Sequence, residues 1–300
     1  MRELELITFA HDKQINLLKN EPMCDHTTFR IGGPAKYFST VGGNQMALLL
    51  EKAKELDIPC VVIGNGSNLL VSDSGFPGLV IKIAEAPIRM LNDQTIEVSA
   101  GTPLARLAVA AAEAGLTGLE FAHGIPGTVG GAVMMNAGAY DSQISDVLVS
   151  SFCYDCESKS FRRLEKEDHR FDYRHSSYME HPERIVTSAV FTLQPGDKGA
   201  IRAKMSDLNA RRRAKQPLEY PSAGSTFKRP EGHFAGKLIE DCGLKGFSIG
   251  GAQVSEKHAG FVINAGGATC EDVLRLMEYI EEQVYLRFGI RLEREVRVLE

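Results

Sequence analysis

The chain contains the stretch Gly124-Ile125-Pro126-Gly127-Thr128-Val129-Gly130-Gly131-Ala132-Val133-Met134-Met135-Asn136-Ala137-Gly138-Ala139-Tyr140, seventeen residues without a charge and rich in small side chains. An exposed loop is normally polar, so this composition predicts a closely packed segment. One interpretation is packing against a large flat ligand, to which Thr128 and Asn136 would offer the few hydrogen bonds. The alternative is a tightly packed helix with turns and no ligand, and the stretch by itself leaves both open.

A second glycine-rich stretch, Ile63-Gly64-Asn65-Gly66-Ser67-Asn68-Leu69-Leu70, directly follows a predicted buried strand. Glycine permits close approach of a ligand to the backbone, and successive N–H groups of such a loop can bind a pyrophosphate. The stretch does not fit the dinucleotide fingerprint of parallel α/β folds, because Leu69 stands at the third glycine position and a strand follows where a helix should begin. A plain turn is the alternative.

A third stretch, Pro221-Ser222-Ala223-Gly224-Ser225-Thr226-Phe227-Lys228-Arg229-Pro230, follows the basic end of a predicted helix. Lys215 before it and Arg229 within it are suited to bind anionic groups of a substrate. Ser225 lacks the flanking glycines of a hydrolase nucleophile elbow, so we do not expect a hydrolase. Taken alone, this serine is also typical of a turn or a helix cap.

Length and composition indicate an ordinary globular chain. Its 300 residues are about twice the length of a usual domain and predict two domains. Hydrophobic residues make up 43% and charged residues 24% of the chain, and the net charge of -5 lacks the basic excess of a nucleic-acid-binding protein. The first residues lead to no long apolar run, so we expect no secretory signal, no membrane association and a cytoplasmic location.

The cysteine pattern predicts no metal site. Six cysteines in a chain of this length are too few for a disulfide scaffold. Cys153 and Cys156 have the spacing of a metal clip, but their would-be partners Cys242 and Cys270 are far from one another in the sequence. The alternation of the predicted strand also turns the thiols of Cys153 and Cys156 to different faces.

Hydrophobic periodicity predicts a mixture of helices and strands, with a domain boundary near residue 198. Glu293 and Glu295 alternate with arginines on the last expected strand, which by itself indicates a solvated, salt-bridged face. We expect helices at 46–56, 103–114, 200–215 and 270–288, the last ended by Gly289. We expect strands at 59–63, 79–83, 95–98 and 290–299, and an antiparallel sheet within 147–193.

Several short motifs, taken in order, resemble the UDP-N-acetylenolpyruvoylglucosamine reductase family. They are Thr28-Phe29-Arg30-Ile31-Gly32-Gly33, Gly64-Asn65-Gly66-Ser67-Asn68-Leu69, Gly124-Ile125-Pro126-Gly127-Thr128-Val129-Gly130-Gly131, Asn136-Ala137-Gly138-Ala139-Tyr140, Tyr173-Arg174, Gly224-Ser225-Thr226-Phe227 and Leu292-Glu293-Arg294-Glu295-Val296-Arg297. The resemblance extends from about residue 20 to the C-terminus. It implies an α+β fold, in which an FAD-binding domain of the vanillyl-alcohol oxidase and PCMH type, with two α+β subdomains, precedes an α+β substrate-binding domain.

Together with the composition along the chain, this resemblance implies three parts. We expect an N-terminal segment at 1–30, the FAD-binding domain at 31–197 and the C-terminal substrate-binding domain at 198–300. The connection from Arg174 to the strand near residue 185 is short. It resembles the class of the family that lacks a tyrosine-bearing loop over the UDP.

The resemblance also implies a reaction and its residues. NADPH would reduce non-covalently bound FAD, whose N5 would deliver a hydride to the enolpyruvyl ether of UDP-N-acetylglucosamine in peptidoglycan precursor synthesis. Ser225 would protonate the neighbouring carbon, while Arg174 and Glu295 would stabilise the enolic carboxylate. The residues expected to bind FAD are Gly64, Asn65, Gly66, Ser67, Asn68, Ile125, Pro126, Gly127, Thr128, Gly130, Gly131, Asn136 and Gly138. Those expected to contact the substrate are Lys215, Arg229 and His258.

One hypothesis and two alternatives accompany this mechanism. A serine hydroxyl is a weak acid, so we hypothesise that Lys228 is the cation that stabilises its alkoxide. A flavin-dependent alcohol oxidase of the same fold would often tether FAD covalently, with His123 the nearest anchor. A non-catalytic nucleotide-sugar binding protein would keep the basic residues but would not need Ser225 and Glu295 together. The sequence does not indicate an oligomeric state.

Overall fold

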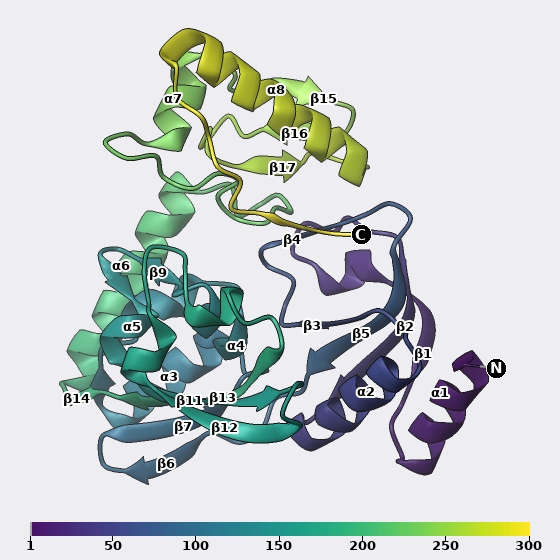
Figure 1. The fold of residues 1–300 in the computed structure, drawn as a ribbon. Helices are drawn as coiled ribbons and strands as arrows, with labels where there is room; N and C mark the ends of the chain where they lie inside the picture. Colours follow the sequence, from purple (N-terminus) through teal and green to yellow (C-terminus); the bar gives the residue numbers. More distant parts are fainter. Residues whose placement is uncertain (1) are drawn as a thin grey trace. The chain divides into compact units, whose positions relative to one another are not determined.

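Short apolar strands and amphipathic helices alternate along the chain, as Figure 1 shows for residues 2–300 of a computed structural model. This mixture confirms the predicted α+β class. Contacts between Cα atoms divide the chain into two units, each built from several segments. Unit 1 comprises Met1–Lys19, Tyr37–Asn65 and Gly78–Arg211, and unit 2 comprises Asn20–Lys36, Gly66–Pro77 and Arg212–Glu300.

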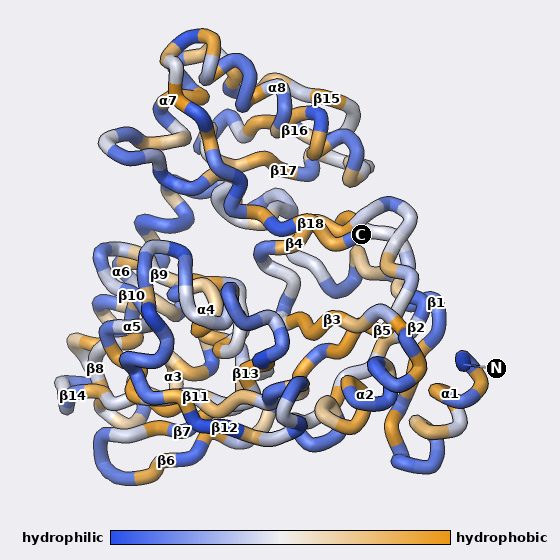
Figure 2. The backbone as a smooth tube through the Cα atoms, viewed as in Figure 1, coloured by the Kyte–Doolittle hydropathy of each residue, from blue (hydrophilic) through white to orange (hydrophobic). Residues whose placement is uncertain are grey.

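A four-stranded sheet with the order β1-β2-β5-β3 contains the first predicted strands. β3 runs parallel to β5, with Cys60 opposite Leu79 and Ile63 opposite Lys82. Such a parallel pair needs a crossover and is usually covered on its faces. Both strands are largely hydrophobic in Figure 2; β5 is mostly buried, whereas β3 is half-buried except at Ile63. Its strands are β1 (Leu18–Pro22), β2 (Pro34–Val41), β3 (Cys60–Ile63) and β5 (Phe76–Ile83).

Two helices of unit 1 pack beside this sheet (Figure 1). α2 (Gly43–Glu55) includes most of the helix predicted at 46–56 and buries Met46, Leu49 and Ala53 in the core. α1 (Arg2–Asp12) buries Leu6 and Ala10 in the same core. The ammonium group of Lys52 on α2 lies 2.6 Å from the carboxylate of Glu5, which joins the two helices. The N-terminal residues are therefore part of the core of unit 1.

A five-stranded antiparallel sheet with the order β12-β11-β13-β7-β6 is the second sheet of unit 1, and it confirms the sheet predicted within 147–193. α3 (Leu104–Ala114) ends at Gly115, whose φ of 75° is left-handed, and Pro103 is its N-cap residue. The prediction had placed this proline inside the first turn. The strands are β6 (Arg89–Asn92), β7 (Thr95–Ser99), β11 (Leu148–Asp155), β12 (Ser160–Glu165) and β13 (Arg184–Thr192).

Short elements complete unit 1, and the long helix α6 (Lys198–Lys215) ends just beyond it. α4 (Val129–Met134) contacts β7 and β13 of the antiparallel sheet. The others are β8 (Leu116–Thr117), η2 (Glu120–Gly124), β9 (Gly138–Ala139), β10 (Ser142–Gln143), α5 (Ile144–Val147), η3 (Lys166–His169), η4 (Ser177–Met179) and β14 (Gln194–Pro195).

Unit 2 is organised around α8 (Cys270–Phe288), which lies against a small antiparallel sheet and α7 (Figure 1). α8 confirms the predicted helix, and Gly289 ends it with a φ of 70°. The C-terminal strand β18 (Arg297–Leu299) runs parallel to β4 (Leu69–Val71). The remaining elements are η1 (Met23–His26), α7 (Ala235–Asp241), β15 (Ser248–Ile249), β16 (Ala252–Val254) and β17 (Val262–Asn264).

The strand predicted at 290–299 is wrong in its extent. Only Arg297–Leu299 forms a strand, while Arg294 makes a single bridge to Phe227. The pairing partner changes along this segment, from residues near Phe227 to β4, so no continuous ladder forms. Alternating polarity indicates an extended backbone. An extended segment is a strand only where it pairs with a neighbouring strand, and most of 290–299 has no such continuous partner.

The division into units also differs from the boundary predicted near residue 198. α6 buries Ile201, Met205 and Leu208 in the core of unit 1, so most of this helix belongs there. Phe29 and Leu70 lie in the core of unit 2, and the segments that contain them, Asn20–Lys36 and Gly66–Pro77, belong to that unit. No helix within residues 2–300 has both the length and the apolar composition to span a membrane.

The first turn of α8 generates a stability prediction. Asp73 accepts hydrogen bonds from the N–H groups of Cys270 at 2.8 Å and Glu271 at 3.1 Å. These are helix donors without intrahelical acceptors, and a carboxylate there also favours the helix dipole. We expect Asp73→Ala to lower the free energy of unfolding by about 1–2 kcal/mol in urea titrations. Asp93→Ala, at an exposed turn residue, is the control and should change it by less than about 0.5 kcal/mol.

Candidate functional site

The first two glycine-rich stretches lie together in unit 1, at residues 64–65 and 126–128. The side-chain amide of Asn65 donates to the carbonyl oxygen of Pro126 at 3.2 Å. A Cβ atom on Gly64 would lie 2.3 Å from Oγ1 of Thr128, so only glycine fits this approach. The backbone N–H groups of Asn65, Gly127 and Thr128 have no acceptor among residues 2–300. These donors and the side chain of Thr128 fit a pyrophosphate of FAD.

Other glycines in the predicted FAD segment are explained by contacts within the protein. A Cβ on Gly130 would lie 2.8 Å from that of Ala100, whose carbonyl oxygen accepts the Gly130 N–H at 2.9 Å. A Cβ on Gly138 would lie 2.7 Å from the carbonyl oxygen of Ser142, in the β9–β10 pair. Gly131 differs, because its Cβ would meet only Oγ1 of Thr128, at 3.8 Å. It therefore leaves room beside Thr128.

Arg174 lies at the tip of a tight turn in unit 1. Asp172 and His175 exchange two backbone hydrogen bonds, of 3.2 and 3.1 Å, and enclose Tyr173 and Arg174. Arg174 has a left-handed φ of 55°, which is uncommon for a residue with a side chain. Its Nη2 donates to the carbonyl oxygen of Gly138 at 3.2 Å, and its guanidinium lies 5.1 Å from the centre of the Tyr173 ring.

A buried polar network flanks this turn. Nδ1 of His169 lies 2.7 Å from the carbonyl oxygen of Glu165, which can only accept, so Nδ1 carries the proton of the neutral ring. Nε2 then accepts from the hydroxyl of Ser151 at 2.7 Å, and the hydroxyl of Tyr178 donates to Ser151 at 2.6 Å. Burial lowers the pKa of His169 below its ordinary value. Burial therefore favours the neutral form of His169.

Ser225 and Glu295 belong to paired segments of unit 2. The N–H of Glu295 donates to the carbonyl oxygen of Thr226 at 2.9 Å, and the side-chain amide of Asn68 donates to the carbonyl oxygen of Glu295 at 3.0 Å. Thr226 is buried and also accepts the Val262 N–H at its Oγ1, at 2.9 Å. Its exposed neighbour Ser225 is therefore held in place by an anchored backbone.

Lys228, the cation of the hypothesis for Ser225, has an acidic partner in unit 2. Its ammonium group is paired with the carboxylate of Glu293, and its N–H donates to the carbonyl oxygen of the same residue at 2.8 Å. The ammonium group and the backbone of Lys228 therefore both contact Glu293.

The three predicted substrate-binding residues lie in unit 2. Nδ1 of His258 accepts the Gly260 N–H at 3.1 Å, which leaves the proton of the neutral ring on Nε2. Burial lowers the pKa of His258, and the positive charges of Lys245 and Lys215 lower it further. The guanidinium of Arg229 lies 3.9 Å from the centre of the Phe234 ring. Within residues 2–300, no three His, Cys, Asp or Glu side chains form a group that could hold a metal ion.

Two family models match this chain. The C-terminal domain of UDP-N-acetylenolpyruvoylglucosamine reductase matches residues 216–299, and an FAD binding domain matches residues 40–157. The UDP-N-acetylenolpyruvoylglucosamine reductase of Agathobacter rectalis is 50% identical, over 95% of this chain and 95% of its own length. This chain belongs to the UDP-N-acetylenolpyruvoylglucosamine reductase family.

Further reductases of the same family are similar to this chain along nearly its whole length. The reductase of Caldanaerobacter subterraneus subsp. tengcongensis is 47% identical, over 96% of this chain and 95% of its own length. The crystal structure of the reductase from Thermus caldophilus has a TM-score of 0.80 at 37% identity, and the match covers 95% of this chain and 99% of that one. The resemblance and the fold that it implied are confirmed.

The matched ranges include most of the predicted site. The FAD binding domain spans both glycine-rich loops, and the reductase C-terminal domain spans Ser225, Arg229, His258 and Glu295. Arg174 and Lys215 lie outside both ranges. Membership of the reductase family favours the reductase over the alcohol oxidase and the binding protein. His123, the anchor expected for the oxidase, contacts the side-chain amide of Asn209 through Nδ1.

Sequence reasoning missed the buried polar network that lies near the Arg174 turn in the chain. The network of Ser151, His169 and Tyr178 joins positions 18 and 27 residues apart. Nothing local in the sequence marks these contacts, because a serine, a histidine and a tyrosine on short elements form no periodic pattern. His169 differs from the exposed histidines in its burial, which only the structure shows.

The neutral state of His169 predicts a pH dependence of stability. Because its pKa is lowered in the folded chain, the unfolded chain binds the proton first, and stability falls as the pH drops below about 6.5, until the folded-state pKa is passed. In His169→Gln this contribution is absent, so urea unfolding should depend less on pH, by up to about 1.4 kcal/mol per pH unit. His11→Gln, at an exposed residue, should follow the wild type. Parallel curves for His169→Gln and wild type would refute the assignment.

Proposed function

We propose that this chain is a UDP-N-acetylmuramate dehydrogenase, a bacterial enzyme of peptidoglycan precursor synthesis. It uses NADPH to reduce the enolpyruvyl ether of UDP-N-acetylglucosamine enolpyruvate to UDP-N-acetylmuramate. The observation that carries this proposal is the identity of about half the residues to reductases along nearly the whole chain. The pairing of the segments that contain Ser225 and Glu295 supports it.

FAD, when bound, supplies the hydride for the enolpyruvyl double bond. In this proposal the N–H groups of Asn65, Gly127 and Thr128 hold its pyrophosphate, because they have no acceptor within residues 2–300. The other FAD-binding residues are those expected from the family motifs: Gly64, Gly66, Ser67, Asn68, Ile125, Pro126, Gly130, Gly131 and Gly138.

Ser225 provides the proton that completes the reduction. The hydride enters at the β-carbon, and the Ser225 hydroxyl then protonates the α-carbon and is reprotonated from water. Arg174 binds the substrate carboxylate, whose negative charge grows as the enolic form develops, and Glu295, as a carboxylic acid, donates a hydrogen bond to the same group. The exposure of Ser225 on an anchored backbone supports its role.

Three residues bind the diphosphate of the UDP group in this proposal. Lys215 and Arg229 offer positive charge, and His258 offers an N–H at Nε2. The partners are NADPH and the nucleotide sugar, with neither a nucleic acid nor a membrane involved. Both partners are water-soluble metabolites, and we infer a cytoplasmic location.

The function is tested by absorption spectroscopy of the purified chain under anaerobic conditions. NADPH should bleach the flavin band, and UDP-N-acetylglucosamine enolpyruvate should restore it. In Ser225→Ala, we expect unchanged bleaching and a restoration that is slower by about 10²–10⁴-fold, because only the proton donor is lost.

The control for this variant is Ser248→Ala, an exposed serine of unit 2, which should restore the band at the wild-type rate. A colourless protein that does not bind added FAD would exclude a flavoenzyme. A normal rate in Ser225→Ala would instead exclude this serine as the proton donor.

Arg229 generates a second prediction of this mechanism. Loss of the positive charge that Arg229 offers to the diphosphate should weaken substrate binding by about 1.4 kcal/mol or more, a tenfold effect. We expect Arg229→Gln to raise the KM for the enolpyruvyl substrate about tenfold and to leave the KM for NADPH within about twofold. Arg202→Gln, at an exposed residue of α6, is the matched control. Equal KM values in Arg229→Gln and wild type would contradict the assignment.

A further inference from the structure

Asn136 uses both of its side-chain donors within unit 1. Its Nδ2 donates to Oε1 of Gln143 at 3.1 Å and to the carbonyl oxygen of Asp172 at 3.1 Å. Its Oδ1 accepts the Ser145 N–H at 3.0 Å. The orientation of the amide is fixed, because the Ser145 N–H can only donate and the Asp172 carbonyl can only accept. The residue is 1% exposed, so this amide has no donor left for a ligand.

The acceptor Asp172 forms the base of the turn that contains Arg174. Its carbonyl oxygen accepts both the Asn136 side chain and the His175 N–H, which uses both of its lone pairs. Asn136 therefore fixes the position of the carbonyl oxygen that closes the turn. Asp172 itself is exposed, so apolar packing contributes little to its position.

Two further hydrogen bonds join the segment 134–138 to this turn. The hydroxyl of Ser176, which is fully buried, donates to the carbonyl oxygen of Met134 at 2.7 Å. Nη2 of Arg174 donates to the carbonyl oxygen of Gly138 at 3.2 Å. Met134, Asn136 and Gly138 thus each contact the segment 172–176, and Asn136 is the contact that reaches the base of the turn.

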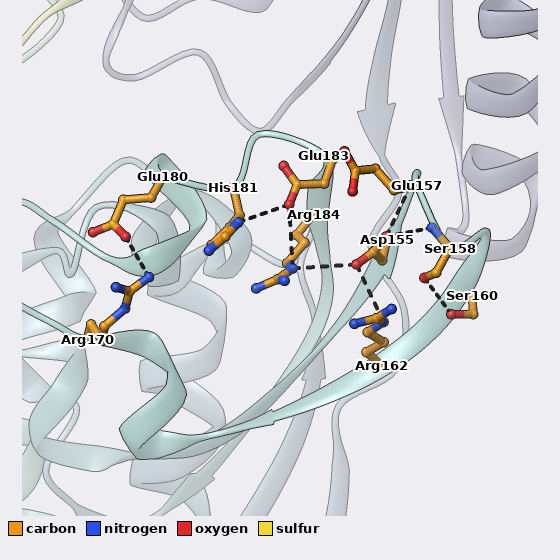
Figure 3. Close-up of polar contacts among 10 residues, drawn as sticks. All are labelled: Asp155, Glu157, Ser158, Ser160, Arg162, Arg170, Glu180, His181, Glu183 and Arg184. Atoms are coloured by element: carbon orange, nitrogen blue, oxygen red, sulfur yellow. Dashed lines mark hydrogen bonds and ion pairs between the residues drawn. The ribbon is translucent and has the colours of Figure 1, made fainter.

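Charged groups hold the outer side of the same segment. Nη2 of Arg170 lies 2.5 Å from the carboxylate of Glu180 (Figure 3), and Nε2 of His175 lies 3.3 Å from the same carboxylate. These side chains are one-third or more exposed, so water and salt screen their attraction. The buried amide of Asn136 is the stronger constraint on the turn.

We propose that Asn136 is a positioning residue, which fixes the turn that presents Arg174 and does not bind the cofactor through its side chain. This replaces the expectation, drawn from the family motif, that Asn136 binds FAD. The inference rests on the proposed function in one respect, namely that Arg174 acts on the substrate carboxylate.

The φ of 42° at Asn136 decides which variants test the proposal. Asn136→Gly removes the side chain and tolerates the left-handed backbone, whereas alanine would add strain. We expect FAD content and bleaching by NADPH at the wild-type level. Restoration of the flavin band by the enolpyruvyl substrate should be about 10- to 100-fold slower, because a displaced binding group loses its alignment.

A second readout requires neither substrate nor cofactor. Hydrogen exchange of the peptide spanning 170–179 should be faster in Asn136→Gly, because the amides of Asp172 and His175 lose a stable turn. Asn20→Gly is the matched control, because Asn20 is exposed and also left-handed, with a φ of 52°. It should match the wild type in both readouts. If Asn136→Gly does not fold, Ser176→Ala removes the neighbouring link and should show the same pattern.

A double variant separates positioning from any direct role. If Asn136 acts through Arg174, Asn136→Gly should slow the Arg174→Ala enzyme by less than about twofold. Loss of FAD from Asn136→Gly, wild-type exchange in residues 170–179, or fully additive losses in the double variant would each overturn the proposal. If wild-type flavin is not reoxidised by the enolpyruvyl substrate, the proposed function fails, and the exchange result still decides whether Asn136 holds the turn.

Discussion

The approach of Gly64 to Thr128 is the constraint on which the FAD-binding part of unit 1 depends. The backbone of Gly64 lies so close to the Thr128 side chain that a Cβ atom at position 64 would lie 2.3 Å from Oγ1 of Thr128. The same absence of side chains lets the segment after Thr128 lie against Ala100 at the start of the α3 region. Packing between the loops therefore requires glycine at position 64, and the N–H groups of Asn65, Gly127 and Thr128 beside it have no acceptor within residues 2–300. In the proposed function, these donors bind FAD.

Unit 2 holds the backbone beside Ser225 by a different physical means. Thr226 uses its N–H, its carbonyl oxygen and its hydroxyl oxygen in bonds to Gly260, Glu295 and Val262. Because all of these groups are hydrogen-bonded, the backbone of Thr226 has little conformational freedom. This also restricts the backbone of the preceding residue, Ser225. Ser225 can therefore be exposed and still be well placed. In both units, the groups to which the proposed function assigns binding or reaction are held by the residues beside them.

Periodicity explains which parts of this structure were predictable. The helices at 46–56, 200–215 and 270–288 and the antiparallel sheet all show strong patterns, and each forms. The strand at 290–299 was too long because polarity alternates wherever the chain is extended, with or without a partner. The units could not be predicted, since Phe29 and Leu70 join the core of unit 2 from distant positions. The motif that contains Asn136 indicated its importance, but only the structure shows which atoms its amide contacts.

The bond from Asn68 to Glu295 joins residues 227 positions apart, and β4 pairs with β18 over a similar separation. During synthesis, a chain that has emerged through residue 211 contains every segment of unit 1 but only two short pieces of unit 2. Phe29, Ile31 and Leu70 then have no core to enter, because α8 and β18 are still to be made. Apolar side chains exposed in this way invite aggregation. The nascent chain must therefore protect these pieces, by itself or with a chaperone, until its last residues leave the ribosome.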